Sequence, residues 1–144
     1  MRVFHLSAEC YPVAKVGGLA DVVGALPKYQ NQLGWQAAVV MPYYDRKFVH
    51  ENEFDIVFAA STLLGTRRLF FEILKEKTDK LGFELYLVRI PGLIDRTEVY
   101  QYPEPRLTRK SFYRKLQLLL RKVFDYCRNS GHVSARPIEA GDQP

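Results

Sequence analysis

The sequence has few cysteines and no long hydrophobic run. Its two cysteines, Cys10 and Cys127, are too few for a disulfide framework or a cysteine-based metal cluster, so we expect neither. No run of about 18 apolar residues occurs, so no membrane-spanning helix is expected. An acid, Glu9, follows the first apolar residues before the core of a signal peptide could form. Together these absences predict a cytoplasmic protein that has no metal site and no membrane partner.

The composition is globular, but the charge is unevenly distributed. Hydrophobic residues make up 47% and charged residues 26% of the 144 residues, which is typical of one ordinary domain. Residues 1–103 hold 12 basic and 12 acidic side chains, whereas residues 104–144 hold 9 basic and 4 acidic ones. The whole net charge of +5 therefore lies in the last part of the chain. Such a shift indicates that this part differs in role from the rest.

The first third of the chain predicts a βαβ unit. The apolar run at residues 2–8 is typical of a strand that is buried on both faces. Residues 19–33 place apolar side chains at helical spacing, with Pro27 expected to kink the helix or start a new turn and Gly34 placed to end it. Residues 35–41 form a second apolar strand. Strand, helix and strand in this order favour a right-handed crossover in a parallel sheet.

The middle of the chain has a different pattern. Residues 53–60 favour a strand, and residues 69–75 and 83–90 flank a turn-like stretch at 77–82, which predicts a β-hairpin. The fold class that these elements predict is α/β. We expect a Rossmann-like parallel sheet with flanking helices and an inserted β-hairpin.

The last part of the chain predicts one helix and then irregular structure. Residues 108–128 have an apolar stripe on one side and arginines and lysines on the other. A basic face is found in helices that bind nucleic acid or membranes, but packing of the stripe on the sheet explains it without a ligand, so we expect no nucleic-acid partner. The periodicity stops after Asn129, and residues 129–144 are typical of coil.

The segment most informative about chemistry is KVGGLADV, from Lys15 to Val22, between the first strand and the first helix. Ligands of such sheets bind where the loops after the strands meet helix N-termini. Gly17 and Gly18 let a ligand approach the backbone, the helix N-terminus offers free N–H groups, and Lys15 adds a cation, which favours a phosphate or pyrophosphate. The alternative is a tight turn with a solvated lysine, because the spacing matches neither common phosphate-binding glycine motif. Asp21 either complements the helix dipole or binds hydroxyls of a sugar or ribose.

Several motifs around this segment resemble one known family. They are S-A-E at 7–9, Y-P at 11–12, K-V-G-G-L-A-D-V-V-G-A-L-P at 15–27, V-M-P-Y-Y at 40–44, D-R at 95–96 and V-Y at 99–100. Over residues 1–103 the chain thereby resembles the N-terminal part of the bacterial glycogen synthases and plant starch synthases.

This resemblance implies an activity and a set of site residues. The family transfers glucose from ADP-glucose to the non-reducing end of an α-1,4-glucan with retention of configuration, in a cleft between two Rossmann-like domains. By resemblance, Lys15 and the backbone of Gly17 and Gly18 would approach the phosphates of the donor. Asp21 would contact ADP-glucose, and Tyr100 would line the same cleft. ADP-glucose and α-1,4-glucan are the partners implied for the complete enzyme, and no cofactor is implied.

The resemblance also implies parts that have no counterpart in this sequence. The family's His-x-His-Asp segment has no match, and neither has the C-terminal domain with its Arg/Lys pair and its glutamate near the reacting bond. Such groups stabilise charge in the transition state. We therefore expect an incomplete N-terminal catalytic domain at residues 1–128, without catalytic residues of its own and inactive alone. We hypothesise that the tail at 129–144 is not the family's own sequence. The alternative is a non-catalytic Rossmann-like module that binds nucleotide or glucan and has a basic tail.

Overall fold

The computed structural model describes residues 1–64, 67–91 and 97–99. Contacts divide the chain into two units, Met1–Pro103 and Glu104–Pro144. All the described helices and strands belong to the first unit. The helix predicted at 108–128 and the tail predicted at 129–144 lie outside the described residues.

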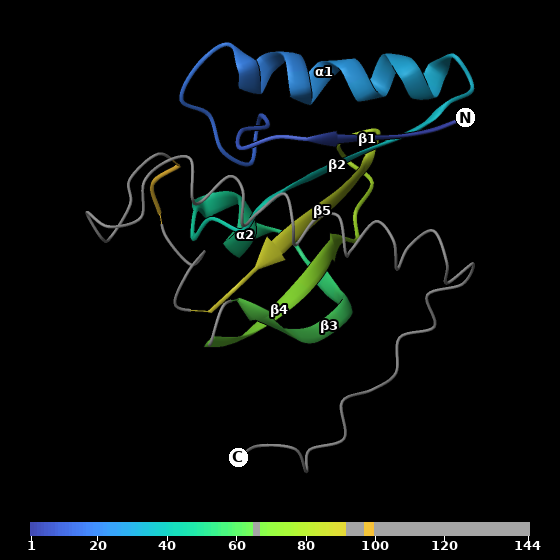
Figure 1. The fold of residues 1–144 in the computed structure, drawn as a ribbon. Coiled ribbons are helices and arrows are strands. Elements are labelled where there is room, and N and C mark those ends of the chain that lie inside the picture. Colours follow the sequence, from blue (N-terminus) through green and yellow to red (C-terminus); the bar gives the residue numbers. More distant parts are fainter. Residues whose placement is uncertain (65–66, 92–96, 100–144) are drawn as a thin grey trace. The chain divides into compact units, whose positions relative to one another are not determined.

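The βαβ unit predicted from the first third of the chain is confirmed (Figure 1). Strand β1 comprises Arg2–Leu6, helix α1 comprises Leu19–Gln32 and strand β2 comprises Gln36–Pro42. β1 and β2 pair in parallel, with Val3 opposite Ala37 and His5 opposite Val39. Six of the seven residues of β2 are buried, as expected for a continuous apolar run inside a parallel sheet.

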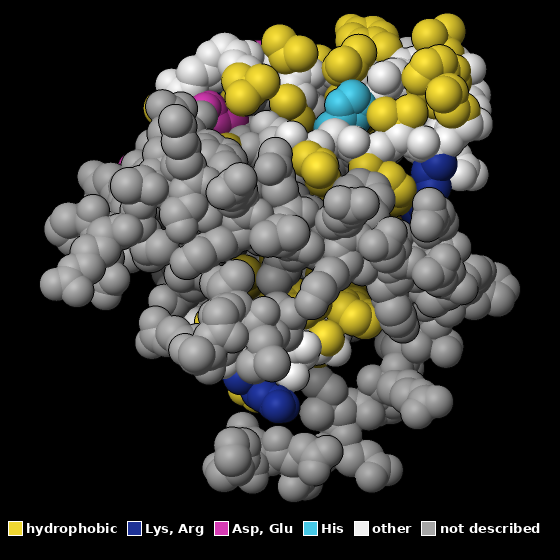
Figure 2. Space-filling view, viewed as in Figure 1, with side chains coloured by type: hydrophobic (Ala, Val, Ile, Leu, Met, Phe, Trp, Pro, Cys, Tyr) yellow, Lys and Arg dark blue, Asp and Glu magenta, His cyan; other side chains and the backbone are white. Residues whose placement is uncertain are grey.

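Helix α1 buries a narrow stripe of small residues and exposes a broader apolar one. Ala20, Val23 and Pro27 are buried, at the spacing of three and four residues that defines one helix face. The large exposed apolar residues of the helix and its C-cap are Leu19, Val22, Leu26, Tyr29 and Leu33. They contribute to the hydrophobic surface around α1 at the top of Figure 2. Most of the apolar residues whose spacing predicts this helix therefore lie on its outer face.

Pro27 and Gly34 affect α1 in different ways. Pro27 lies inside α1 and is buried, and α1 continues through it as a single helix, so the expected new turn does not occur. Gly34 has a φ of 82° directly after the helix. Gly34 N donates to Asn31 O and Trp35 N donates to Gln30 O, each at 3.0 Å, which completes a Schellman motif. The prediction that Gly34 ends the helix is confirmed.

Five strands form one mixed sheet in the order β1-β2-β5-β4-β3. After the short helix α2 (Lys47–Glu51), which no sequence pattern predicted, β3 (Phe54–Leu64) and β4 (Arg67–Glu76) run antiparallel. β5 (Glu84–Arg89) pairs antiparallel with β4, so the predicted hairpin around residues 77–82 is confirmed. β5 also pairs in parallel with β2, which makes it the third parallel strand of the sheet. Along the chain, the antiparallel pair β3–β4 is therefore inserted between the parallel strands β2 and β5, and in the sheet it lies beside β5.

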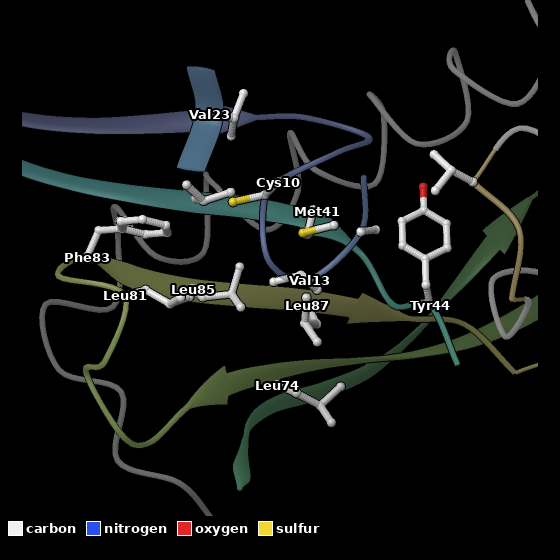
Figure 3. Packing of buried hydrophobic residues seen from close by; sticks show 13 residues of the cluster. Cys10, Val13, Val23, Met41, Tyr44, Leu74, Leu81, Phe83, Leu85 and Leu87 are labelled. Atoms are coloured by element: carbon white, nitrogen blue, oxygen red, sulfur yellow. The ribbon is translucent and has the colours of Figure 1, made fainter. Parts of the chain in front are cut away.

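The hydrophobic core joins the sheet to α1 and to the loop between β1 and α1. Figure 3 shows Cys10 and Val13 of this loop among Val23 of α1, Met41 of β2 and Leu85 of β5. All five are at most 7% exposed. Full burial of an aliphatic side chain contributes about 1.5–3 kcal/mol, so the loop is fixed by packing at its start. That packing positions the exposed residues that follow.

Candidate functional site

The loop between β1 and α1 has a buried start and an exposed end. Cys10 and Ala14 are buried and exchange two backbone hydrogen bonds, of 3.0 and 2.9 Å. Tyr11 N donates to Ala20 O at 3.0 Å, which ties the loop to the first turn of α1. Residues 15–18, which we call the glycine limb, are exposed. The glycine limb is therefore held between a packed loop and a helix.

The loop approaches α1 so closely that one helical position has room only for glycine. A Cβ atom on Gly24 would lie 2.5 Å from the carbonyl oxygen of Tyr11. A Cβ atom on Gly17 or Gly18 would meet no atom within 4 Å, and neither residue has a positive φ. The close packing of the loop thus explains why position 24 is glycine. The fold does not require glycine at positions 17 and 18. The open space over Gly17 and Gly18 is available to a ligand.

The glycine limb and the start of α1 present backbone N–H groups. Val16 N and Gly17 N each donate to Glu9 Oε2 at 2.8 Å. Within the described part of the chain, the N–H groups of Gly18 and Leu19 have no hydrogen-bond acceptor. Free N–H groups in the first turn, together with the positive end of the helix dipole, favour an anion. The N–H of Gly17 is thus occupied, and those of Gly18 and Leu19 are open to an anion.

The structure brings Lys15 and Asp21 together. Lys15 Nζ lies 2.7 Å from both carboxylate oxygens of Asp21 and 5.8 Å from the centre of the Tyr11 ring. Both side chains of the ion pair are about half exposed (49% and 53%), so the pair contributes only about 0–1 kcal/mol to stability. Asp21 lies in the first turn of α1, where an acid also complements the helix dipole. Asp21 uses two of the three ammonium donors, so one donor remains for an anion.

A groove of about 470 Å³ opens beside this loop, where the parallel strands end. It is lined by residues of the segments that follow β1, β2 and β5: Tyr11, Pro12, Val13, Ala14, Lys15, Arg46, Lys47, Phe48, Thr97 and Glu98. Arg46 Nε donates to Thr97 O at 2.6 Å, and its guanidinium lies 3.5 Å from Glu98 Oε2. The lining carries three cations, Lys15, Arg46 and Lys47, against one acid, Glu98. Asp21 and Glu51 pair with Lys15 and Lys47 at 2.7 and 3.5 Å and offset part of this charge. The lining itself has an excess of positive charge, which favours an anionic ligand.

The predicted site residues fall into three groups. Lys15, Gly18 and Asp21 lie together at the N-terminus of α1. Gly17 lies beside them, with its N–H donated to Glu9. Tyr100 lies outside the described residues.

Sequence reasoning missed three charged residues near this site, Glu9, Arg46 and Lys47. Glu9 is an acid shortly after β1, whose residues are half-buried or exposed and not buried on both faces as predicted, and Arg46 and Lys47 are adjacent cations shortly after β2. The carboxyl ends of neighbouring parallel strands meet at one edge of a sheet. That rule could have placed these three residues at the site.

Cys10 lies in the same loop but is not a nucleophile. Its side chain is fully buried, and burial raises the pKa of the thiol to about 12, only partly offset by the charge of Lys28. The reactive thiolate is therefore scarce near neutral pH. Cys10 is therefore a plain buried thiol.

In the part of the chain that the structure describes, no group of three or more His, Cys, Asp or Glu side chains could hold a metal ion. In the same residues, none of the helices has the length and apolar character needed to cross a membrane.

The fold and the groove together define a class of protein. Three parallel strands, a crossover helix and a groove where the strands end form part of a Rossmann-like α/β domain. The family model described as the starch synthase catalytic domain matches residues 2–133. This chain belongs to that family. The resemblance seen in its motifs is thereby confirmed.

Similar curated proteins are glycogen synthases. The glycogen synthase of Flavobacterium johnsoniae is 56% identical over 104 residues, which cover 72% of this chain and 22% of that protein. The glycogen synthase of Kosmotoga olearia is 37% identical over 101 residues, which cover 70% of this chain and 21% of that protein. This chain thus spans about a fifth of the length of these relatives.

A solved structure confirms the fold. The catalytic domain of starch synthase IV from Arabidopsis thaliana, bound to ADP and acarbose, matches with a TM-score of 0.65 and 24% sequence identity. The match covers 85% of this chain and 26% of that chain. The predicted α/β architecture is therefore confirmed.

Proposed function

We propose that this chain supplies the donor-binding loop of a glycogen synthase, which transfers glucose from ADP-glucose to the non-reducing end of an α-1,4-glucan. The glycine limb carries the proposal. It has two exposed glycines that the fold does not require, next to a lysine and to free N–H groups of a helix N-terminus. Membership of the starch synthase family and the ADP bound to the Arabidopsis neighbour support a nucleotide-sugar donor.

Each residue of the loop has a proposed role. Lys15 gives its remaining ammonium donor to a phosphate oxygen of the donor, and Gly18 gives its backbone N–H. Gly17 leaves space for the phosphates to approach the backbone. Asp21 orients Lys15 and accepts a hydrogen bond from a hydroxyl of ADP-glucose. Tyr100 lines the same cleft by its resemblance to the family.

The resemblance places the groups that stabilise charge at the breaking glycosidic bond in other parts of the complete enzyme. We propose that the 144-residue chain alone is inactive and that the complete enzyme acts in the cytoplasm.

A chimera tests this function. Residues 1–103 replace the equivalent segment of the Flavobacterium johnsoniae glycogen synthase, and transfer of glucose from ADP-glucose to glycogen is measured. We expect an active chimera, and Lys15→Ala should weaken kcat/KM for ADP-glucose by about 1–3 kcal/mol, the range for a lost charged hydrogen bond. Lys80→Ala is the matched control, because Lys80 is exposed in the turn between β4 and β5. Equal kinetics for Lys15→Ala and Lys80→Ala would contradict the role of Lys15.

A non-catalytic module that binds nucleotide or glucan is the second candidate. It is favoured by one observation: the acids at the site within the described residues, Asp21 and Glu98, are each paired with a cation, Lys15 and Arg46. An inactive chimera, combined with binding of ADP at Gly18 in the 144-residue chain, would favour this candidate.

A further inference from the structure

Glu9 is one of two buried acidic side chains in the described part of the chain, and the proposed donor chemistry does not use it. It is 3% exposed and follows β1. Its Oε2 accepts hydrogen bonds from Val16 N and Gly17 N, each at 2.8 Å. Its own backbone is fixed by Ser7, whose Oγ donates to Glu9 O at 2.6 Å and accepts from Glu9 N at 3.2 Å. The carboxylate therefore joins the packed start of the loop to the glycine limb.

The Glu9 carboxylate occupies a position that suits an anion. Successive backbone N–H groups form a concavity that binds negative charge, and hydrogen bonds to a charged acceptor are roughly twice as strong as neutral ones. Because Glu9 fills the N–H groups of Val16 and Gly17, these are closed to a phosphate. The N–H groups of Gly18 and Leu19 have no acceptor within the described residues, so they stay open to a phosphate.

We propose that Glu9 is a positioning residue for the donor site. It fixes the glycine limb and, by filling the N–H groups of Val16 and Gly17, directs the anion of the donor to Gly18 and Leu19. The identity of the anion rests on the proposed function, whereas the holding of the limb rests on the hydrogen bonds alone.

Glu76 provides a matched control for Glu9. It is the other buried acid, at 2% exposed, and its Oε1 accepts a hydrogen bond from Thr78 N at 2.9 Å in the turn after β4. This turn leads into β5, so it lies where the parallel strands begin, whereas the groove lies where they end. A general effect of removing a buried carboxylate would therefore appear in Glu76→Gln as well.

Hydrogen exchange of individual amides tests the holding of the limb in the full 144-residue chain, labelled with ¹⁵N. We expect slow exchange at Val16 and Gly17 in the wild type. Glu9→Gln should speed exchange at both by at least tenfold, because a neutral amide oxygen is a weaker acceptor than a carboxylate. Glu9→Ala should speed it further, and added formate should restore protection by taking the vacated position. Glu76→Gln should leave Val16 and Gly17 unchanged.

Titration with sodium pyrophosphate tests where the anion goes, which a purely structural role of Glu9 would not affect. In the wild type the amide signals of Gly18 and Leu19 should shift, and those of Val16 and Gly17 should not. In Glu9→Ala the signals of Val16 and Gly17 should shift as well. Glu76→Gln should show the wild-type pattern.

Two results would overturn the inference. One is wild-type exchange at Val16 and Gly17 in both Glu9 variants, and the other is a shift of these two amides by pyrophosphate in the wild type. If Glu9→Ala does not fold, Glu9→Gln carries the test, because it keeps the size of the side chain and an acceptor oxygen. If pyrophosphate shifts no wild-type amide while Glu9→Gln still speeds exchange, the proposed donor site is contradicted and the holding of the limb by Glu9 is supported.

Discussion

Replacing Gly24 with alanine should destabilise the chain, although alanine is the better helix former. In the interior of a helix, glycine to alanine gains about 0.5–1 kcal/mol. At Gly24, however, the new Cβ would lie 2.5 Å from the carbonyl oxygen of Tyr11 and 3.3 Å from its carbonyl carbon and nitrogen. These are backbone atoms, so no flexible side chain can turn away to make room.

The loop around Tyr11 is held too firmly to move at little cost. Tyr11 N is bonded to Ala20 O at 3.0 Å, and the neighbouring residue Cys10 is fully buried and bonded twice to Ala14. Overpacking costs about 1–3 kcal/mol, and a strained or lost backbone hydrogen bond adds about 0.5–1.5 kcal/mol. After the gain in helix propensity is subtracted, Gly24→Ala should lower the free energy of unfolding by about 0.5–4 kcal/mol.

Urea denaturation of the 144-residue chain, followed by circular dichroism, measures this loss. Gly17→Ala is the matched control. Its Cβ would meet nothing within 4 Å, so its free energy of unfolding should stay within about 0.5 kcal/mol of the wild type. A Gly24→Ala chain as stable as the wild type would refute the close approach of loop and helix. A Gly17→Ala chain as unstable as Gly24→Ala would show that the limb needs glycine for folding, which removes the argument for a ligand.

Three other side chains give further expectations for the purified chain. Lys15→Ala should change the free energy of unfolding by at most about 1 kcal/mol, because its ion pair is half exposed, and a larger loss in urea denaturation would mean that the pair is structural. In a Cys127→Ser background, Cys10 should resist a thiol reagent at about pH 8 until urea unfolds the chain, because burial raises the pKa of its thiol to about 12. Rapid labelling of Cys10 in the folded chain would contradict its burial. Burial raises the pKa of Glu84, but the hydrogen bond and charge of Lys75 help to outweigh it, so the pKa is lowered overall from 4.5. The stabilisation by Glu84 is therefore present above its unfolded pKa and lost as the pH falls through its folded pKa. Glu84→Gln should flatten the acid limb of the curve of stability against pH, and an unchanged acid limb would contradict this.

The sequence predicted the βαβ unit because its signals are local. A short continuous apolar run that ends at a proline, such as β2, favours a buried strand, and Gly34 takes the positive φ that a Schellman motif needs. The orientation of α1 was not predictable from spacing. The stripe of Ala20, Val23 and Pro27 and the stripe of larger residues both have helical spacing, and only the close approach of the loop selects the smaller residues for the inner face.

The pairing of β5 shows a second limit of local pattern. Residues 83–90 predict one arm of a hairpin, and the structure adds a parallel partner, β2, more than 40 residues earlier in the chain. A run that is apolar on both faces fits either kind of pairing equally well. The sequence therefore predicts the presence of β5 but does not place it in the middle of the sheet.

The candidate site divides in the same way. Lys15, Gly18 and Asp21 belong to one continuous motif, so their closeness could be predicted from its position before a helix. Arg46 joins the groove from the segment after the next strand, which depends on the sheet. The occupied N–H of Gly17 depends on the fold of the loop, because only that fold returns the limb to Glu9.

Three separate contacts make the loop rigid, and this rigidity has a consequence for binding. The loop is fixed at its start by the Cys10–Ala14 pair, at the helix by the approach of Tyr11 to Gly24, and at the limb by Glu9. N–H groups that are already in place need no reorganisation when an anion arrives, which is what makes oriented dipoles effective. Of the two phosphate contacts proposed in the described residues, Lys15 and the N–H of Gly18, only Lys15 is a long, flexible side chain. Substitutions at the fixed contacts should therefore act first on stability, whereas substitutions in the limb should act first on donor affinity.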